Sequence, residues 1–169
     1  MFNSLSAIID SFNQKVSNCV AWLTTLMVVT MFSIVVLRYG FNMGSIALQE
    51  SITYMHGLVF MLAIAHTLKI DGHVRVDIFY QLFGSKGRAW VNLIGSLCLL
   101  LPVCIFIIYI SWDYVQTSWS YLEGSREAGG LDAVFLLKSL VPLMAALLLL
   151  QGLSEAMKSI CTLRNRGTR

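Results

Sequence analysis

The sequence predicts an all-α integral membrane protein, one membrane domain over residues 1–169. It should contain four transmembrane helices plus N-terminal and middle-loop interfacial amphipathic helices. Hydrophobic residues make up 57% of the chain and charged residues only 12%, about half the charged share of an ordinary soluble domain. The mean hydropathy is +0.72. Four stretches reach the roughly 20 apolar residues that a helix needs to cross a bilayer. Because backbone amides in the bilayer core must be paired within the segment, these stretches are expected to be helices and not strands.

Residues 1–15 are predicted to form an interfacial helix that lies on the membrane. Their apolar side chains recur at three- and four-residue steps, and polar side chains fill the opposite side. The first transmembrane helix follows over residues 16–37 and carries no charge. No signal peptide is expected, because Asp10 and Lys15 interrupt the apolar character of the N-terminal stretch and no small-residue cleavage site follows.

The second transmembrane helix is predicted over residues 52–70, with Glu50 at its entry and His56 and His66 among its apolar residues. The loop after it should contain a short surface helix over residues 75–84. In that segment apolar residues recur at i, i+1, i+4 and i+5, with polar residues on the opposite side. The apolar residues are Ile78, Phe79, Leu82 and Phe83.

The third transmembrane helix is predicted over residues 89–112, with a possible extension to residue 122. The segment from 113 to 122 contains neither proline nor glycine and keeps a helical stripe of apolar residues. A helix of that full length would reach roughly 50 Å, so it must tilt strongly or project outward. The fourth span is predicted over residues 133–153. Pro102 and Pro142 lie inside spans, where they are possible sites of kinks.

The basic residues predict the orientation, because loops on the cytoplasmic side carry an excess of lysine and arginine. With four spans, both termini and the middle loop share one side, which holds nine basic residues against three on the other side. The nine are Lys15, Lys69, Arg75, Lys86, Arg88, Lys158, Arg164, Arg166 and Arg169, and the three are Arg38, Arg126 and Lys138. We therefore predict a bacterial inner-membrane protein with both termini in the cytoplasm.

Ionisable residues within the spans are the first candidates for function, because their burial is costly. His56 and His66 lie ten positions apart on one helix and cannot clamp a single haem from opposite faces. Hydrogen bonds to neighbouring helices or to a partner are the expected role. A proton or sodium relay would need several acids at midplane depth, and the sequence has none there. We predict that the chain has no ion-coupling pathway and no catalytic residue of its own.

Other classes of site are poorly supported. The four cysteines form no CxxC pair and have no metal-ligand spacing, so neither a metal site nor a disulfide is expected. P-loop and dinucleotide motifs are missing, and no serine or cysteine stands at a readable spacing from a histidine. The net charge of +3 is too small to suggest nucleic acid as a partner, and membrane lipids are expected instead.

Two regions are candidates for structural or partner contacts. Arg38 closes the first span and Glu50 opens the second, both on the predicted outer side, where a pair between them would cap the loop. The middle loop holds the dense polar run from Gly72 to Asp77, in which Gly72 permits a sharp turn. In that run His73, Arg75 and Asp77 are candidates for anchoring the surface helix or binding a partner, with a solvated turn as the alternative.

At these residues the sequence resembles the small membrane subunit of tripartite ATP-independent periplasmic (TRAP) transporters, the DctQ/SiaQ family. The resemblance covers the whole chain through its four-span plan and length. Its motifs are the run Arg38-Tyr39-Gly40-Phe41-Asn42, the pair Gln49-Glu50, and the run Gly72-His73-Val74-Arg75-Val76-Asp77. The family often has two acids where Gln49-Glu50 stands, whereas this chain has only one. It also often has a glycine where this chain has Asp71, a difference expected to be without consequence.

The resemblance implies a small, non-transporting scaffold subunit of a sodium-coupled TRAP transporter that imports organic acids. Its partners would be a large membrane subunit, which would hold the sodium sites, and a periplasmic substrate-binding protein. No cofactor is expected in this chain itself. If the segment after the third span projects outward, Glu123, Arg126 and Glu127 are candidate contacts for the binding protein. The substrate cannot be predicted, because the binding protein would set it.

Three other classes remain as alternatives. A membrane anchor subunit of a redox enzyme would show a haem absorbance band. A membrane thiol-redox enzyme would need reactive cysteine pairs on one side, whereas Cys98 and Cys104 are predicted in the middle of a span. A stand-alone four-helix exporter would need an acid embedded in the membrane.

Overall fold

The computed structural model describes residues 2–73, 80 and 82–165, and the elements found in them are helices. They are α1 (Phe2–Gly40), α2 (Ile46–Lys69), α4 (Ser85–Ile94), a π-helical segment (Gly95–Leu100), α5 (Leu101–Ser120) and α6 (Val134–Asn165). Because α4, the π-helical segment and α5 follow one another without a break, the described residues contain four helices long and apolar enough to cross a membrane. The prediction of an all-α fold with four spans is confirmed.

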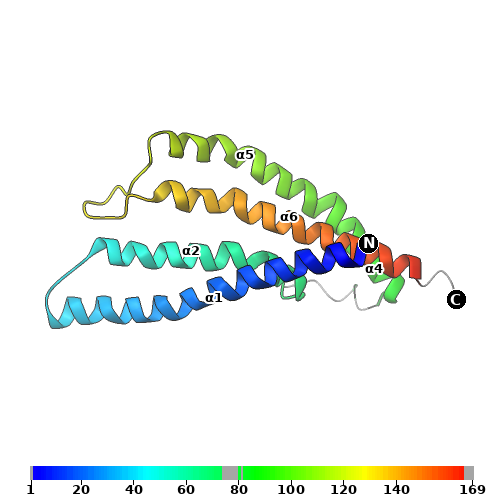
Figure 1. The fold of residues 1–169 in the computed structure, drawn as a ribbon, viewed down its shortest axis with the longest axis horizontal. Helices are drawn as coiled ribbons and strands as arrows, with labels where there is room; N and C mark the ends of the chain where they lie inside the picture. Colours follow the sequence, from blue (N-terminus) through cyan, green and yellow to red (C-terminus); the bar gives the residue numbers. More distant parts are fainter. Residues whose placement is uncertain (1, 74–79, 81, 166–169) are drawn as a thin grey trace.

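The four long helices form an open fan and not a closed bundle (Figure 1). They lie in the order α1, α2, α6, α5, and α6 contacts every other helix. Among the described residues, α1 and α5 lie at the two edges and share no extensive contact. The helices converge at the end that holds the start of α1 and the end of α6, here called the terminal end. They spread toward the end that holds the residue 41–45 and 121–133 connections, here called the loop end.

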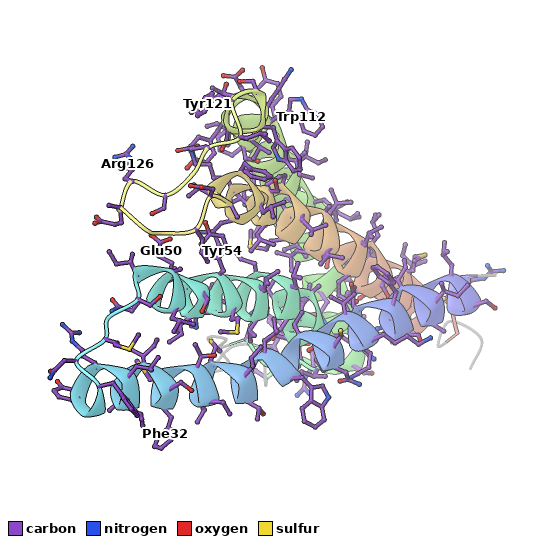
Figure 2. The ribbon with its side chains drawn as sticks, turned by 60° about the vertical axis from the view of Figure 1, so that its left-hand side comes forward. Phe32, Glu50, Tyr54, Trp112, Tyr121 and Arg126 are labelled. Carbon is purple, nitrogen blue, oxygen red and sulfur yellow. The ribbon has the colours of Figure 1, made fainter. Side chains whose placement is uncertain are left out.

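The interior of the fan is narrow. Small side chains lie where helices cross, such as Ala65 in α2 and Ala145 in α6, which are both fully buried. Large apolar side chains cover the outside instead, for example Trp22, which is 76% exposed, and Phe32, which points away from the other helices (Figure 2). Such a surface suits lipid tails or partner helices and would not suit water.

Residues 1–15 do not form a separate interfacial helix as expected, because α1 runs without a break from Phe2 to Gly40. No proline and no glycine interrupts the segment before Gly40, so nothing ends the helix near residue 15. Its 39 residues correspond to roughly 58 Å, well beyond a hydrocarbon core of about 30 Å. The polar side of the N-terminal segment packs against α6, with Asn13 only 1% exposed, whereas the apolar Ile8 is 66% exposed.

α2 begins six residues earlier than predicted, because Ser45 caps its first turn by accepting a hydrogen bond from the Leu48 amide (3.4 Å). Its C-terminal end is closed by two backbone bonds, from Asp71 to the Leu68 carbonyl (3.2 Å) and from Gly72 to the Thr67 carbonyl (2.9 Å). This pair of bonds is a Schellman motif. Asp71 has the left-handed φ of 59° that such a motif requires. The turn therefore depends on Asp71, in a conformation for which glycine is the better residue.

The third span is continuous from Ser85 to Ser120, which bears out the extension predicted beyond residue 112. Pro102 has no amide hydrogen for the Cys98 carbonyl, and its ring would clash with that carbonyl in a regular helix. The π-helical segment widens the backbone immediately before this proline. Pro142 lies inside α6, which stays a single helix.

α6 continues twelve residues beyond the predicted end at residue 153, to Asn165. The added turns carry Ser154 and Lys158, whose side chains bind Asp10 of α1. Of the surface helix predicted over residues 75–84, residues 75–79 and 81 lie outside the described residues. Tyr80 is helical, and a turn at Leu82 and Phe83 leads into α4.

Candidate functional site

At the loop end, Glu50 connects α2 to the loop between α5 and α6 (Figure 2). One carboxylate oxygen accepts a hydrogen bond from the Ser125 hydroxyl, and the other accepts one from the Leu131 amide at 2.6 Å. The loop is closed on itself by a bond from the Ser125 amide to the Leu131 carbonyl (3.1 Å). Glu50 thus fastens a preformed loop onto the first turns of α2.

Gly130 makes the close approach of the Glu50 carboxylate to the loop possible. A Cβ atom on Gly130 would lie 2.7 Å from the Glu50 Oε2 atom and 2.6 Å from the Ser125 Cβ atom, so a larger residue would push the carboxylate away. Gly129 next to it has a φ of 79°, a conformation that other residues rarely adopt. The enclosure of Glu50 by this turn could not be read from the sequence.

A second polar group lies beside the first. Glu123 accepts hydrogen bonds from Lys138 of α6, with which it also forms an ion pair, and from the Ser118 hydroxyl of α5 (2.6 Å). The Lys138 ammonium also lies 4.1 Å from the centre of the Tyr114 ring. The hydrogen bond from Lys138, followed by that from Ser118, holds the pKa of the Glu123 carboxyl below its usual value. These contacts join the end of α5 to the start of α6.

The structure separates several residues that the sequence grouped together. The expected pair between Arg38 and Glu50 does not form, because the Glu50 carboxylate is occupied by Ser125 and Leu131. Glu123 is turned into the contact with Lys138, and its side chain is only 19% exposed. Arg126 and Glu127 are exposed, and Arg126 points away from the helices at the outer edge of the loop (Figure 2).

The middle-loop candidates are only partly described. Gly72 and His73 follow the end of α2, and Gly72 is packed closely enough that an added Cβ atom would lie 3.0 Å from the Thr67 methyl group. Arg75 and Asp77 lie outside the described residues, so their roles stay predictions.

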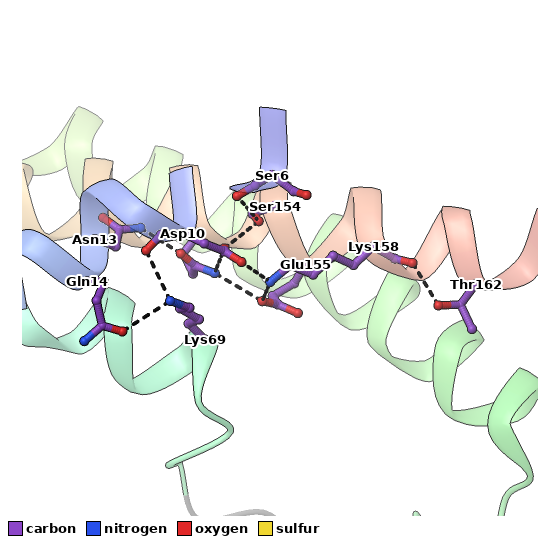
Figure 3. Close-up of polar contacts among 10 residues, drawn as sticks. Ser6, Asp10, Asn13, Gln14, Lys69, Ser154, Glu155, Lys158 and Thr162 are labelled. Carbon is purple, nitrogen blue, oxygen red and sulfur yellow. Dashed lines mark hydrogen bonds and ion pairs between the residues drawn. The ribbon is translucent and has the colours of Figure 1, made fainter. Parts of the chain in front are cut away.

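At the terminal end, a larger polar cluster joins α1, α2 and α6 (Figure 3). Gln151 of α6 is fully buried. It accepts a hydrogen bond from Asn13 (2.8 Å) and donates to Asp10 (2.9 Å) and Glu155 (3.1 Å). The Ser154 hydroxyl also donates to Asp10 at 2.8 Å. Side chains 138 to 144 positions apart in the chain therefore bind one another directly.

Two lysines balance the acids of this terminal-end cluster. Lys158 lies 2.7 Å from both Asp10 and Glu155. Lys69, at the end of α2, donates to the Asp10 carbonyl (3.3 Å) and to the Gln14 side chain (3.2 Å). With two acids and two lysines, the cluster is close to neutral and largely paired, which is the condition for placing charges among packed helices at acceptable cost.

Sequence reasoning missed this cluster, although a signal was present. Gln151, Ser154, Glu155 and Lys158 recur at three- and four-residue steps, so they share one face of a helix. The predicted end of the fourth span at residue 153 divided that face and hid the pattern.

His56 and His66 lie too far apart to bind one ligand together. His56 and His66 are separated by roughly 15 Å along α2, and His56 stacks on Phe60 with ring centres 6.3 Å apart. In the part of the chain that the structure describes, no group of three or more His, Cys, Asp or Glu residues could hold a metal ion. The polar groups described here therefore attach the helices to one another at the two ends of an apolar fan.

The model of a family described as "Tripartite ATP-independent periplasmic transporters, DctQ component" matches residues 13–162. No curated protein and no solved structure matches the chain.

Proposed function

The chain belongs to the DctQ component family of the tripartite ATP-independent periplasmic transporters, and from this premise we propose that it is a non-transporting scaffold subunit. It is a multi-pass membrane protein and a transporter component, and not an enzyme. In the proposed role it packs against a larger membrane subunit that moves an organic acid with sodium. A periplasmic binding protein delivers the acid to that subunit.

The observation that carries the proposal is how the charged residues inside the four long helices are used. At least seven of them are held by partners within the chain, at one end of the fan or the other: Asp10, Glu50, Lys69, Arg88, Lys138, Glu155 and Lys158. Groups fixed in this way fasten helices together and do not relay an ion. The wide exposed apolar surfaces then provide the area on which a membrane partner can pack.

The proposal includes an orientation with both termini in the cytoplasm, supported by the excess of basic residues at the terminal end. The loop end would then face the periplasm and the binding protein. Cysteine introduced at Arg126 in a cysteine-free chain should react with a membrane-impermeant reagent applied from outside the inner membrane. Labelling only after the membrane is opened would contradict this orientation.

The test of the scaffold role is co-purification from membranes in which the tagged chain is produced with its large subunit. We expect the two to be recovered together after solubilisation in mild detergent. Recovery of the tagged chain without the large subunit, from membranes that demonstrably contain both, would contradict the proposal.

Arg126 and Glu127 remain candidate contacts for the binding protein because both are exposed at the loop end. The double variant Arg126→Glu/Glu127→Lys should weaken docking of the binding protein and leave recovery of the large subunit unchanged. Glu123→Lys is not a suitable probe, because it would break the ion pair with Lys138. Unchanged docking and uptake with the double variant would remove these two residues from the interface.

A further inference from the structure

The exposed residues of α2 form one narrow stripe. Five residues of this helix are exposed, namely Ile46, Gln49, Thr53, His56 and Phe60, and every position from 61 to 69 is buried or half-buried. At 100° per residue these five positions fall within a sector about 80° wide. α2 is therefore enclosed by the rest of the chain except along this stripe, in the half of the helix nearer the loop end.

Three of the five side chains in the α2 stripe are polar and have no hydrogen bond within the described part of the chain. Other hydroxyls of α2 are satisfied locally, since Ser51 donates to the Leu48 carbonyl (2.7 Å) and Thr67 to the Ala63 carbonyl (3.1 Å). No such bond is found for Thr53, and none for the side chains of Gln49 and His56. The stacking of His56 on Phe60 uses the face of the ring and satisfies neither ring nitrogen.

The part of the α2 stripe from Thr53 to Phe60 lies at membrane depth, whereas Gln49 lies in the first turn of the helix, beside Glu50 at the loop end. His56 is ten residues from the start of the helix, which is roughly 15 Å along its axis, in a segment that must span a hydrocarbon core of about 30 Å. Lipid tails offer no hydrogen bond, so a polar stripe against them is unfavourable. The exposed stripe of α6 contrasts with it, because its residues Leu136, Leu143 and Leu150 are all apolar.

We infer that the α2 stripe is the surface on which a transmembrane helix of the large subunit packs, through side chains that hydrogen-bond to Gln49, Thr53 and His56. The inference rests on the proposed function, since it assigns the position of that partner. A protein helix fits this surface better than a lipid, because it brings hydrogen-bonding groups to the required depth. Small Thr53 in the middle of the stripe allows close approach, and Phe60 adds apolar packing at its inner end.

The first test compares affinities of the full chain for the large subunit. The variant Gln49→Leu/Thr53→Val/His56→Leu removes the polar groups but keeps an apolar surface, so insertion into the membrane is preserved. Each interhelical hydrogen bond between side chains contributes about 0.6 to 1.4 kcal/mol, so the loss should be about three- to tenfold for each bond removed. The control is Thr30→Val in α1, whose hydroxyl is satisfied by the Leu26 carbonyl at 2.8 Å.

The second test uses a photoreactive amino acid placed singly at Thr53, with Leu143 of α6 as the matched position at similar depth. We expect a crosslink to the large subunit from position 53 and a weaker one, or only lipid adducts, from position 143. Crosslinks from position 53 to lipid alone, or to a second copy of this chain, would overturn the inference. So would undiminished affinity of the triple variant.

The two proposals fail in different ways. If the unaltered chain does not retain the large subunit at all, the proposed function is contradicted. If the unaltered chain and the triple variant retain the large subunit equally well, the scaffold role stands. Only the assignment of the α2 stripe as the contact surface is then wrong.

Discussion

Glu50 binds a serine hydroxyl and a backbone amide that lie 75 and 81 positions away in the chain. Because α2 and the loop after α5 meet through this side chain, its carboxylate joins the two halves of the fan at the loop end. The geometry requires Gly130, since any Cβ atom there would collide with the carboxylate and with Ser125. The sequence suggested that Glu50 caps the loop between α1 and α2, but in the structure it anchors the 121–133 loop between α5 and α6.

The variant Glu50→Ala should loosen the 121–133 loop, because the Ser125 hydroxyl and the Leu131 amide lose their acceptor. We expect faster trypsin cleavage after the exposed Arg126 and a lower melting temperature of the purified chain. Asp113→Ala, which removes an exposed carboxylate from α5 near the same end, should change neither. Equal cleavage rates for the two variants would show that Glu50 does not hold the loop.

Glu123 predicts a dependence on pH. Its pKa in the folded chain is lowered, chiefly by the hydrogen bond from Lys138. A group with a lowered pKa stabilises the fold above its usual pKa, and this contribution is lost as the pH falls through the folded value. The melting temperature of the unaltered chain should therefore exceed that of Glu123→Gln near neutral pH, and the difference should shrink below pH 4.5. A difference that stays constant with pH would contradict this assignment.

At the scale of the helices, packing depends on a few glycines. A Cβ atom on Gly152 of α6 would lie 2.7 Å from a methyl carbon of Leu100, whereas one on Gly95 would meet nothing within 4 Å. Gly152→Leu should therefore destabilise the chain by about 1 to 3 kcal/mol through overpacking. Gly95→Leu, the same substitution in the neighbouring π-helical segment, should be tolerated. Thermal unfolding in detergent measures both, and similar losses for the two would contradict the packing described here.

The helices themselves could be predicted because hydropathy is a local property of the sequence. Four long apolar stretches are enough to indicate four spans. The absence of proline and glycine beyond residue 112 predicted an extension of the third helix to residue 122, close to its observed end at Ser120. The ends of α1 and α6 could not be predicted this way. Their polar residues look like surface residues in the sequence, but Asp10 and Gln151 bind each other across 141 positions.

The candidate sites were only partly predicted, because their contacts also join residues far apart in the chain. Glu50 and Glu123 were recognised from their chemistry and position, yet their partners Ser125 and Lys138 follow only from the way α5 and α6 return toward α2. The Schellman turn at Asp71 depends on one backbone angle, which the residue type did not indicate. Spacing on one helix is visible in a sequence, whereas contacts between helices are not.

At the scale of the whole molecule, the fan is held at both ends and exposed between them. The terminal-end cluster joins α1, α2 and α6, and the loop-end contacts join α2, α5 and α6. Between the ends, much of the surface is apolar, as for a component that is completed by a membrane partner.

The most direct test of the scaffold role is solute uptake into proteoliposomes under a sodium gradient, using the ligand of the cognate binding protein. Vesicles would contain this chain alone, the large subunit alone, or both, with the binding protein present in each case. We predict no uptake by this chain alone and full uptake only when both membrane subunits are present. Sodium-driven uptake by this chain alone would contradict the account.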